Sequence, residues 1–312
     1  MIKPELREIF SGSLFEGEIK FMEPMSSHTS LRIGGNADIY ALPADIPSLI
    51  GILINLKNNG IPFFALGGGT NILVRDNGIE GAVISLKSFK NITKIKEDGD
   101  SVIIYAGSGV LLQRFVNYCK ENGYKGIEEL AGIPGTIGGA IYGNAGSFGL
   151  EIKDVLYSID IMNEAGLIKR FTPDSLNFGY RTSGISSGNI IIGAEIKLKK
   201  GDKKEIAEKI GDFLKIKKEK QPIWEPSAGC VFKNPPGLYA GRLIEEAGCK
   251  GLRVGDVEVS NLHANFFINK GRAKADDFLK LMEIVLYRVK RKTGIILEPE
   301  IKIIGRDEIA EG

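Results

Sequence analysis

The sequence predicts an α+β protein of two domains, with a boundary near residue 200. Its 312 residues exceed the ~150 residues of a typical single domain. Short apolar runs typical of strands alternate with helical periodicities before that point. The composition then changes to a lysine-rich amphipathic segment over residues 197–220. We therefore predict a first domain over residues 1–200, with lobes at about 26–95 and 96–200, and a smaller α/β domain over residues 201–312.

The elements of the first domain follow from apolar runs bounded by glycine, proline and asparagine. Strands are predicted over residues 36–42, 63–66, 72–74, 82–86, 102–106 and 190–198. One helix covers residues 47–59, from Asp45 near its start to Gly60 as its stop. A second helix, which ends at Gly123, has one apolar face made by Val110, Leu111, Phe115, Val116 and Cys119. Residues 155–162 and 167–171 flank a turn ending in Gly166 and predict a hairpin.

The second domain begins with a helix in the lysine-rich segment, whose apolar positions include Ile206 and Ile210. We interpret this charge run as a solvated linker helix and not as a nucleic-acid patch. Beyond it, strands are predicted over residues 230–233, 257–259, 266–268 and 295–304, and helices over residues 239–246 and 276–292.

Composition excludes several classes of function. The 41 Lys and Arg against 39 Asp and Glu give a net charge of +2, too little for a general nucleic-acid binder. No run approaches the ~18 apolar residues of a membrane span, and the first residues lack a signal-peptide pattern. Three cysteines without CxxC spacing and two histidines predict neither disulfides nor a metal site. We expect a cytoplasmic protein without bound metal.

Glycine points to a ligand. It contributes 40 residues, nearly twice the usual share of ~7%. The run Gly67-Gly68-Gly69-Thr70-Asn71 follows a predicted strand, so that consecutive backbone N–H groups can surround a pyrophosphate. It matches neither a Walker P-loop nor a Rossmann fingerprint, and Gly107-Ser108-Gly109 matches the latter only weakly because Leu112 takes the third glycine position.

A second glycine-dense segment covers residues 132–149 and predicts a long ordered loop. Its backbone can approach a flat ring closely and present N–H and C=O groups to the ring edge. Two such loops in one domain indicate one large ligand touched at both ends, with the length of a dinucleotide cofactor.

Six motifs in order give the chain a resemblance to a known enzyme family, the UDP-N-acetylenolpyruvoylglucosamine reductases (MurB). They are Thr29-Ser30-Leu31-Arg32-Ile33-Gly34-Gly35, residues 67–71, residues 132–149, Gly179-Tyr180-Arg181-Thr182-Ser183, Ser227-Ala228-Gly229-Cys230-Val231-Phe232-Lys233-Asn234-Pro235 and Leu297-Glu298-Pro299-Glu300. The resemblance implies a two-lobed FAD domain of the vanillyl-alcohol-oxidase type, noncovalent FAD and NADPH as hydride source. It also implies a cytoplasmic step of peptidoglycan synthesis that forms UDP-N-acetylmuramate, for cell-wall biogenesis.

The resemblance further implies which residues bind FAD. These are Arg32, Gly67, Gly68, Gly69, Thr70, Asn71, Gly132, Ile133, Pro134, Gly135, Thr136, Gly138, Gly139, Asn144 and Gly146.

Three residues match the family's catalytic positions. Arg181 matches an arginine whose planar fork suits a carboxylate that gains charge during the reaction. Cys230 stands where many relatives carry a serine proton donor, and a thiol, being a stronger acid than an alcohol, can fill that role. Glu300 matches a glutamate that stabilises the intermediate or positions the proton; Glu298, two residues away, shares its strand face.

Substrate contacts are implied for Tyr180, Lys220, Asn234 and His263. Only eight residues separate Arg181 from Ile190, so the chain resembles the compact subtype, which lacks a tyrosine-bearing loop over the nucleotide. We expect a monomer.

Two other functions remain open at this point. A thiol hydrolase would use Cys230, His263 and Asn265, but it leaves both glycine loops unexplained. A non-catalytic nucleotide-binding protein would use the loops and leave Arg181, Cys230 and Glu300 without a task.

Overall fold

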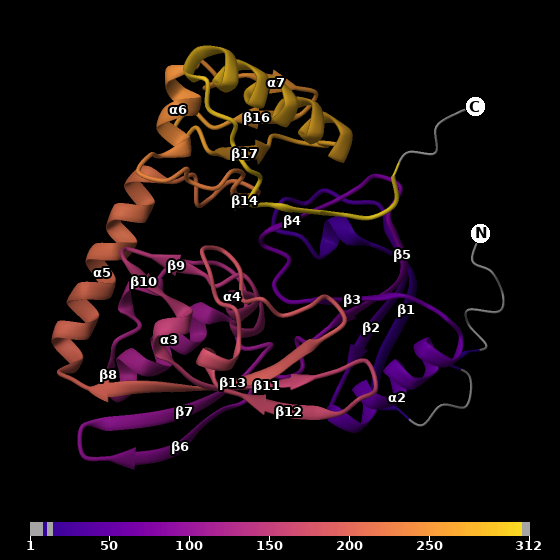
Figure 1. Cartoon of the computed structure of the whole chain (residues 1–312), viewed down its shortest axis with the longest axis vertical. Helices are drawn as coiled ribbons and strands as arrows, with labels where there is room; N and C mark the ends of the chain where they lie inside the picture. The colour runs from indigo at the N-terminus through magenta and orange to yellow at the C-terminus, as the bar shows by residue number, and fades with distance from the viewer. Residues whose placement is uncertain (1–8, 11–14, 308–312) are drawn as a thin grey trace. The chain divides into compact units, whose positions relative to one another are not determined.

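The structure, a computed structural model, describes residues 9–10 and 15–307 and divides into two compact units (Figure 1). The first contains Met1–Phe21, Ile39–Gly68 and Gly81–Ile216, and the second contains Met22–Asp38, Gly69–Glu80 and Lys217–Gly312. This course differs from the predicted contiguous division at residue 200. Two early segments belong to the second unit because Leu31, Ile33 and Leu73 lie in the hydrophobic core of the C-terminal residues. Such distant packing leaves no trace in local composition.

One sheet has the strand order β1-β2-β5-β3, and β3 and β5 are parallel. Its strands are β1 (Gly17–Pro24), β2 (Asn36–Pro43), β3 (Phe63–Leu66) and β5 (Ile79–Ser85). Helix α2 (Ile46–Asn58) contributes Leu49, Ile52 and Leu56 to the core beside this sheet. The side chain of Asp45 accepts a hydrogen bond from Ser48 N at the start of α2, as the sequence indicates.

The larger sheet of the first unit is antiparallel, with the order β12-β11-β13-β7-β6 and with β8 also paired to β13. Its strands are β6 (Ile92–Asp98), β7 (Ser101–Gly107), β8 (Tyr124–Lys125), β11 (Leu156–Met162), β12 (Ile168–Phe171) and β13 (Ile190–Lys200). Helices α3 (Leu112–Asn122) and α4 (Ile137–Tyr142) pack on this sheet (Figure 1). The predicted hairpin is confirmed as β11 and β12.

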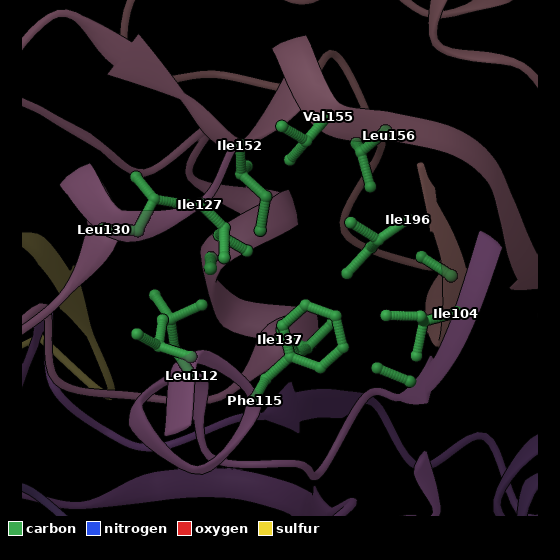
Figure 2. Packing of buried hydrophobic residues seen from close by; sticks show 14 of the residues in the cluster. Ile104, Leu112, Phe115, Ile127, Leu130, Ile137, Ile152, Val155, Leu156 and Ile196 are labelled. Atoms are coloured by element: carbon green, nitrogen blue, oxygen red, sulfur yellow. The ribbon is translucent and has the colours of Figure 1, made fainter. Parts of the chain in front are cut away.

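The core of this region explains why a glycine-rich sequence stays ordered. Figure 2 shows Phe115 of α3, Ile137 of α4 and Ile104 and Ile196 of the sheet in one apolar cluster, and all four side chains are buried. Each such side chain contributes about 1.5–3 kcal/mol by leaving water. The cluster therefore anchors α4, which forms the middle of the glycine-rich segment 132–149.

That helix corrects the prediction of a loop over residues 132–149. The Thr136 side chain accepts a hydrogen bond from Gly139 N at the first turn, and Ile137 and Ile141 are fully buried. The favourable packing of these residues outweighs the cost of about 1 kcal/mol for each helical glycine. A short hairpin follows, formed by β9 (Gly146–Ser147) and β10 (Leu150–Glu151).

The second unit contains an antiparallel sheet with the order β14-β17-β16-β15, against which α6 and α7 pack (Figure 1). Its elements are β14 (Ser227–Cys230), α6 (Ala240–Glu246), β15 (Arg253–Val254), β16 (Val257–Val259), β17 (Phe266–Asn269) and α7 (Ala275–Thr293). A separate parallel pair joins β4 (Ile72–Val74) to β18 (Lys302–Ile304). Helix α5 (Lys203–Lys220), the predicted amphipathic helix, belongs to the first unit up to Ile216 and not to the second domain as the sequence predicts, because Ile206 and Ile210 are buried in the core of the first unit.

Three further differences from the sequence prediction concern exposed chain. The sequence does not predict β1 or β6: only Ile19 and Phe21 of β1 pack against the core, and β6 is exposed at six of its seven residues. The predicted strand over residues 295–304 is a strand only over β18. In the part of the chain that the structure describes, no helix combines the length and apolar character needed to cross a membrane.

Candidate functional site

The glycine run of residues 67–71 lies where the chain passes from the first compact unit to the second. Gly67 and Gly68 belong to the first unit, where a Cβ atom on Gly68 would come within 2.7 Å of Gly135 Cα. In the second unit Ser30 N donates to Gly69 O at 2.9 Å, and Asn71 Nδ2 donates to Glu300 O at 3.3 Å. Glycine is therefore needed in this run partly because backbone segments pack closely against it, and not only for a ligand.

Within the first unit, Gly67 and Gly68 contact the second glycine segment directly, so both segments adjoin one place in the structure. A Cβ atom on Gly67 would lie 2.8 Å from Thr136 Oγ1, and one on Gly68 would lie 2.7 Å from Gly135 Cα. Gly132 N donates to the Gln113 side chain at 2.8 Å, which fixes the start of the second segment. Sequence reasoning missed Gln113 because a polar residue on an amphipathic helix carries no signal for such a contact.

The weak dinucleotide match at residues 107–109 has a structural explanation. Added Cβ atoms on Gly107 and Gly109 would collide with the backbone oxygens of Phe89 and Leu86. Gly138 N donates to Ser108 O at 2.9 Å, so this turn is hydrogen-bonded to the first turn of α4. These glycines therefore serve chain packing.

Gly139 differs from the packing glycines. It is exposed although its neighbours Gly138 and Ala140 are buried, and an added Cβ would meet only Thr136 Oγ1, at 3.6 Å. Gly132 and Gly135 have φ of +76° and +115°, conformations that glycine adopts without strain. At Gly132, Gly135 and Gly139 no side chain of the residue itself covers the backbone, so its polar groups can approach a flat cofactor that bears phosphates.

Other predicted cofactor residues have diverse surroundings. Ile133 and Gly146 are partly buried, Pro134 is exposed, and Thr136 is the buried cap of α4. Arg32 is exposed, has φ of +56°, and belongs to the second unit. Its carbonyl oxygen lies 3.5 Å from the buried side chain of Asn269, which also donates to Leu31 O at 3.1 Å.

Arg181 lies in a tight turn of the first unit. Gly179 N donates to Thr182 O at 2.9 Å and Thr182 N donates to Gly179 O at 3.2 Å, which leaves Tyr180 and Arg181 at the end of the turn. Arg181 has φ of +60°, its guanidinium carbon lies 5.0 Å from the centroid of the exposed Tyr180 ring, and its Nη2 donates to Gly146 O at 3.3 Å. A non-glycine residue in this conformation is uncommon and suggests a functional constraint.

Cys230 and Glu300 are brought together in the second unit. Cys230 is half-buried at the end of β14, after Gly229 with φ of +76° has shifted the pairing with β17. Glu300 N donates to Val231 O at 2.7 Å, so the glutamate lies on the segment paired with the residue that follows Cys230. The third proposed catalytic residue, Arg181, belongs to the other unit.

The structure separates the two glutamates that the sequence placed on one strand face. Glu298 is exposed and forms an ion pair with Lys233. Glu300 is half-buried, and its carbonyl oxygen accepts the hydrogen bond from Asn71. Glu300 therefore has the more constrained backbone beside Cys230.

The other two cysteines are core residues. Cys119 and Cys249 are buried, at 1% and 0% exposure, and burial raises the pKa of each thiol. A buried protonated thiol is neither a nucleophile nor an accessible acid. This leaves Cys230 as the partly accessible cysteine of the chain.

The predicted substrate residues all lie in the second unit except Tyr180. Lys220 is exposed at the end of α5. The Asn234 side-chain oxygen accepts a hydrogen bond from Ala240 N at 2.9 Å, at the start of α6. Asn234 therefore has a structural task in addition to any contact with a ligand.

His263 contacts the backbone of its own loop. Its Nδ1 accepts a hydrogen bond from Asn265 N at 3.2 Å, and burial lowers the pKa of the ring. The Asn265 side chain, 1% exposed, accepts from Phe232 N at 3.0 Å and donates to Phe232 O at 2.7 Å. Because both ends of this amide hold Phe232, it does not orient His263 as the thiol-hydrolase alternative requires.

Sequence comparisons identify both domains. The profile of the FAD binding domain matches residues 37–172, and that of the UDP-N-acetylenolpyruvoylglucosamine reductase C-terminal domain matches residues 221–304. The UDP-N-acetylenolpyruvoylglucosamine reductase of Pelobacter propionicus is 41% identical over 95% of this chain and 99% of the relative. That of Caldanaerobacter subterraneus is 42% identical over 96% of this chain and 97% of the relative.

A solved structure agrees with these relatives. The crystal structure of UDP-N-acetylenolpyruvylglucosamine reductase (MurB) from Thermus caldophilus superposes with a TM-score of 0.78, at 34% identity. The match covers 93% of this chain and 100% of that one. The predicted α+β fold with an FAD-binding domain is thereby confirmed, and the chain belongs to the UDP-N-acetylenolpyruvoylglucosamine reductase family.

Proposed function

We propose that this enzyme reduces the enolpyruvyl group of UDP-N-acetylglucosamine enolpyruvate to form UDP-N-acetylmuramate, with Arg181, Cys230 and Glu300 as its catalytic residues. Membership of the family supports FAD as the cofactor, NADPH as the reductant and a place in peptidoglycan-precursor synthesis. The observation that carries the residue assignment is the 2.7 Å hydrogen bond from Glu300 N to Val231 O, which ties the backbone of the glutamate to the residue that follows Cys230.

The substrate's chemistry determines what these residues must do. Its carbon–carbon double bond is conjugated to a carboxylate, so hydride adds to the outer carbon and negative charge moves onto the carboxylate oxygens. Bound FAD, once reduced by NADPH, supplies that hydride. The carbon that bears the carboxylate then takes a proton.

Arg181 suits the developing charge. Its guanidinium is permanently charged and can donate two parallel hydrogen bonds to one carboxylate. The Gly146 carbonyl and the Tyr180 ring restrict the side chain before substrate arrives. A donor fixed in advance stabilises charge that appears only in the transition state.

Cys230 supplies the proton and Glu300 supports that transfer. The thiol is half-buried and its strand is held on both sides, by Phe266 in β17 and, through Val231, by Glu300 N. A fixed donor delivers its proton from one direction, which sets one configuration at the new centre. The Glu300 carboxyl group lies on the neighbouring segment, where it can orient the transfer.

We further propose that FAD is bound noncovalently. The matched FAD-binding region, residues 37–172, contains no histidine, and its one cysteine, Cys119, is buried with a raised pKa. Residues of the two glycine segments, among them Gly139, would hold the cofactor through backbone groups.

The place and state of the enzyme are also proposals. A reducing cytoplasm suits an accessible thiol donor such as Cys230. We propose a monomer, which light scattering coupled to size-exclusion chromatography tests. A mass near 33.9 kDa supports it, and twice that mass contradicts it.

A stepwise absorption experiment tests the function. Purified protein should be yellow, lose its flavin absorbance with NADPH under anaerobic conditions, and regain it when the enolpyruvyl nucleotide is added. Trichloroacetic acid should release the flavin into the supernatant if it is noncovalent. Protein that binds FAD but is not reoxidised by the nucleotide would contradict the proposal and favour a non-catalytic nucleotide-binding protein.

A matched pair of glycine substitutions tests the cofactor surface. We expect Gly139→Ala to weaken FAD binding about tenfold, because its Cβ would protrude from an open surface, without loss of apoprotein stability. Gly68→Ala should instead lower the free energy of unfolding by about 1–3 kcal/mol, since its Cβ would be 2.7 Å from Gly135 Cα. Flavin titration and urea unfolding measure the two effects. Unchanged FAD affinity in Gly139→Ala would exclude that surface as the FAD site.

A further inference from the structure

The turn that carries Arg181 needs support from its surroundings. Arg181 has φ of +60°, a conformation that is unfavourable for a non-glycine residue and persists only where neighbouring groups enforce it. The two hydrogen bonds between Gly179 and Thr182 close the turn but do not fix it against the rest of the first unit.

The buried side chain of Asn144 provides that attachment. Its Nδ2 donates to Gly179 O at 2.9 Å and to Glu151 Oε2 at 3.0 Å, and its Oδ1 accepts from Lys153 N at 3.4 Å. Asn144 is 0% exposed and has φ of +43°. Its amide is thus oriented by Glu151, which forms an ion pair with Lys153 at 2.7 Å. Both amide hydrogens are taken up by protein groups, so the role in FAD binding that the resemblance implies for Asn144 stays a prediction and would fall to its backbone.

Two further hydrogen bonds flank this one. Ser183 Oγ donates to Tyr142 O at 2.9 Å, and Arg181 Nη2 donates to Gly146 O at 3.3 Å. Residues 142–146 and 179–183 are therefore joined at three points, and Asn144 makes the central one, which holds the main chain of the turn. The same short segment continues from α4, whose exposed Gly139 belongs to the proposed FAD surface.

We propose that Asn144 is a positioning residue, which holds the Gly179 carbonyl and so fixes the Arg181 guanidinium relative to the FAD-binding surface of the first unit. The proposal rests on the catalytic role of Arg181 given above. In this role Asn144 does not contact the substrate. It acts through the turn that carries Arg181. A displacement of about 1 Å of a catalytic group can lower a rate 100-fold.

Two substitutions separate the side chain from the backbone of Asn144. Asn144→Gly keeps a residue that tolerates positive φ but removes the amide, and Asn144→Asp keeps the size but replaces both donor hydrogens by an oxygen facing Glu151. We expect each to slow reoxidation of reduced FAD by the enolpyruvyl nucleotide about 10–100-fold. FAD content and the rate of reduction by NADPH should stay within about twofold, which also shows that the variants fold.

Ser158→Ala is the matched control. It removes another buried hydrogen bond of the first unit, from Ser158 Oγ to Glu195 Oε2 at 3.0 Å, on the β11 and β13 strands. Its rates should equal those of the unmodified enzyme. An equal slowing in Ser158→Ala would overturn the proposal, because any loosening of this unit would then suffice.

A double-mutant cycle identifies the route of the effect. Arg181→Lys keeps the charge but loses the planar fork, so rates remain measurable. If Asn144 acts through Arg181, adding Asn144→Gly to Arg181→Lys should slow reoxidation far less than it does alone; full multiplication of the two effects would refute the proposal. If Arg181→Lys alone changes nothing, the catalytic role of Arg181 fails. If Arg181→Lys slows reoxidation and Asn144→Gly does not, only the role of Asn144 fails.

Discussion

Cys230→Ala should slow the reoxidation of reduced FAD by the enolpyruvyl nucleotide about 10²–10⁴-fold, the range of rate loss when a general acid is removed. The reduction of FAD by NADPH should keep its rate, because that step needs no proton from Cys230. Stopped-flow absorbance measures the two half-reactions separately in one preparation.

The physical reason lies in how the strand presents the thiol. The positive φ of Gly229 interrupts regular pairing just before Cys230, and the two hydrogen bonds of Asn265 fix Phe232 just after it. Alanine occupies the same backbone without strain but carries no proton. Solvent water is then the remaining donor, and it is neither oriented nor held at the substrate.

Two companion variants make this result specific. Cys249→Ala removes a buried thiol from the same compact unit, where burial raises the pKa, and should leave both half-reactions unchanged. Cys230→Ser keeps a proton on a side chain of similar size and should recover most of the lost rate. Equal losses in both half-reactions of Cys230→Ala would refute the assigned role.

Local sequence signals determined most of the elements. The strands β3 and β4 have the predicted bounds because proline, glycine or asparagine adjoins each short apolar run, and β16 has them between Asp256 and Ser260. Helices α2 and α7 differ from prediction by only one residue at each end. These elements carry their own start and stop signals, so distant contacts do not change them.

Other elements depend on partners that a sequence does not reveal. Helix α4 forms in a glycine-rich segment because Ile137 and Ile141 pack against the larger sheet. Residues 69–80 belong to the second unit because β4 pairs in parallel with β18, which lies more than two hundred residues further along the chain. Propensity and composition describe neither contact.

The candidate site shows the same division. The family's motifs sufficed to propose Arg181, Cys230 and Glu300, whose side chains carry the chemistry that each step requires. They did not show that the Asn144 and Asn234 side chains hold the protein's own backbone, because the carbonyl and N–H partners come from separate segments. An asparagine can serve a ligand or the chain, and geometry alone decides between the two.

Glu300→Gln should slow reoxidation by the enolpyruvyl nucleotide about 10²–10³-fold. The change keeps the size of the side chain and the backbone hydrogen bonds to Val231 and Asn71, but it removes the negative charge and the ability to take up a proton. The loss should therefore report carboxylate chemistry and not a displaced strand. Single-turnover absorbance measures it, and unchanged NADPH-dependent reduction shows that FAD remains bound.

Glu298→Gln provides the comparison within the same segment. Glu298 is exposed and paired with Lys233, and such surface ion pairs contribute about 0–1 kcal/mol, so its loss should change reoxidation less than about threefold. Because both variants exchange one carboxylate for an amide on the segment that pairs with Phe232 through Pro299, they share the general electrostatic change. A larger loss in Glu298→Gln than in Glu300→Gln would transfer the catalytic assignment to Glu298. A larger loss in Glu300→Gln than in Glu298→Gln would show that the carboxylate of Glu300 itself matters, and not the overall charge of the segment.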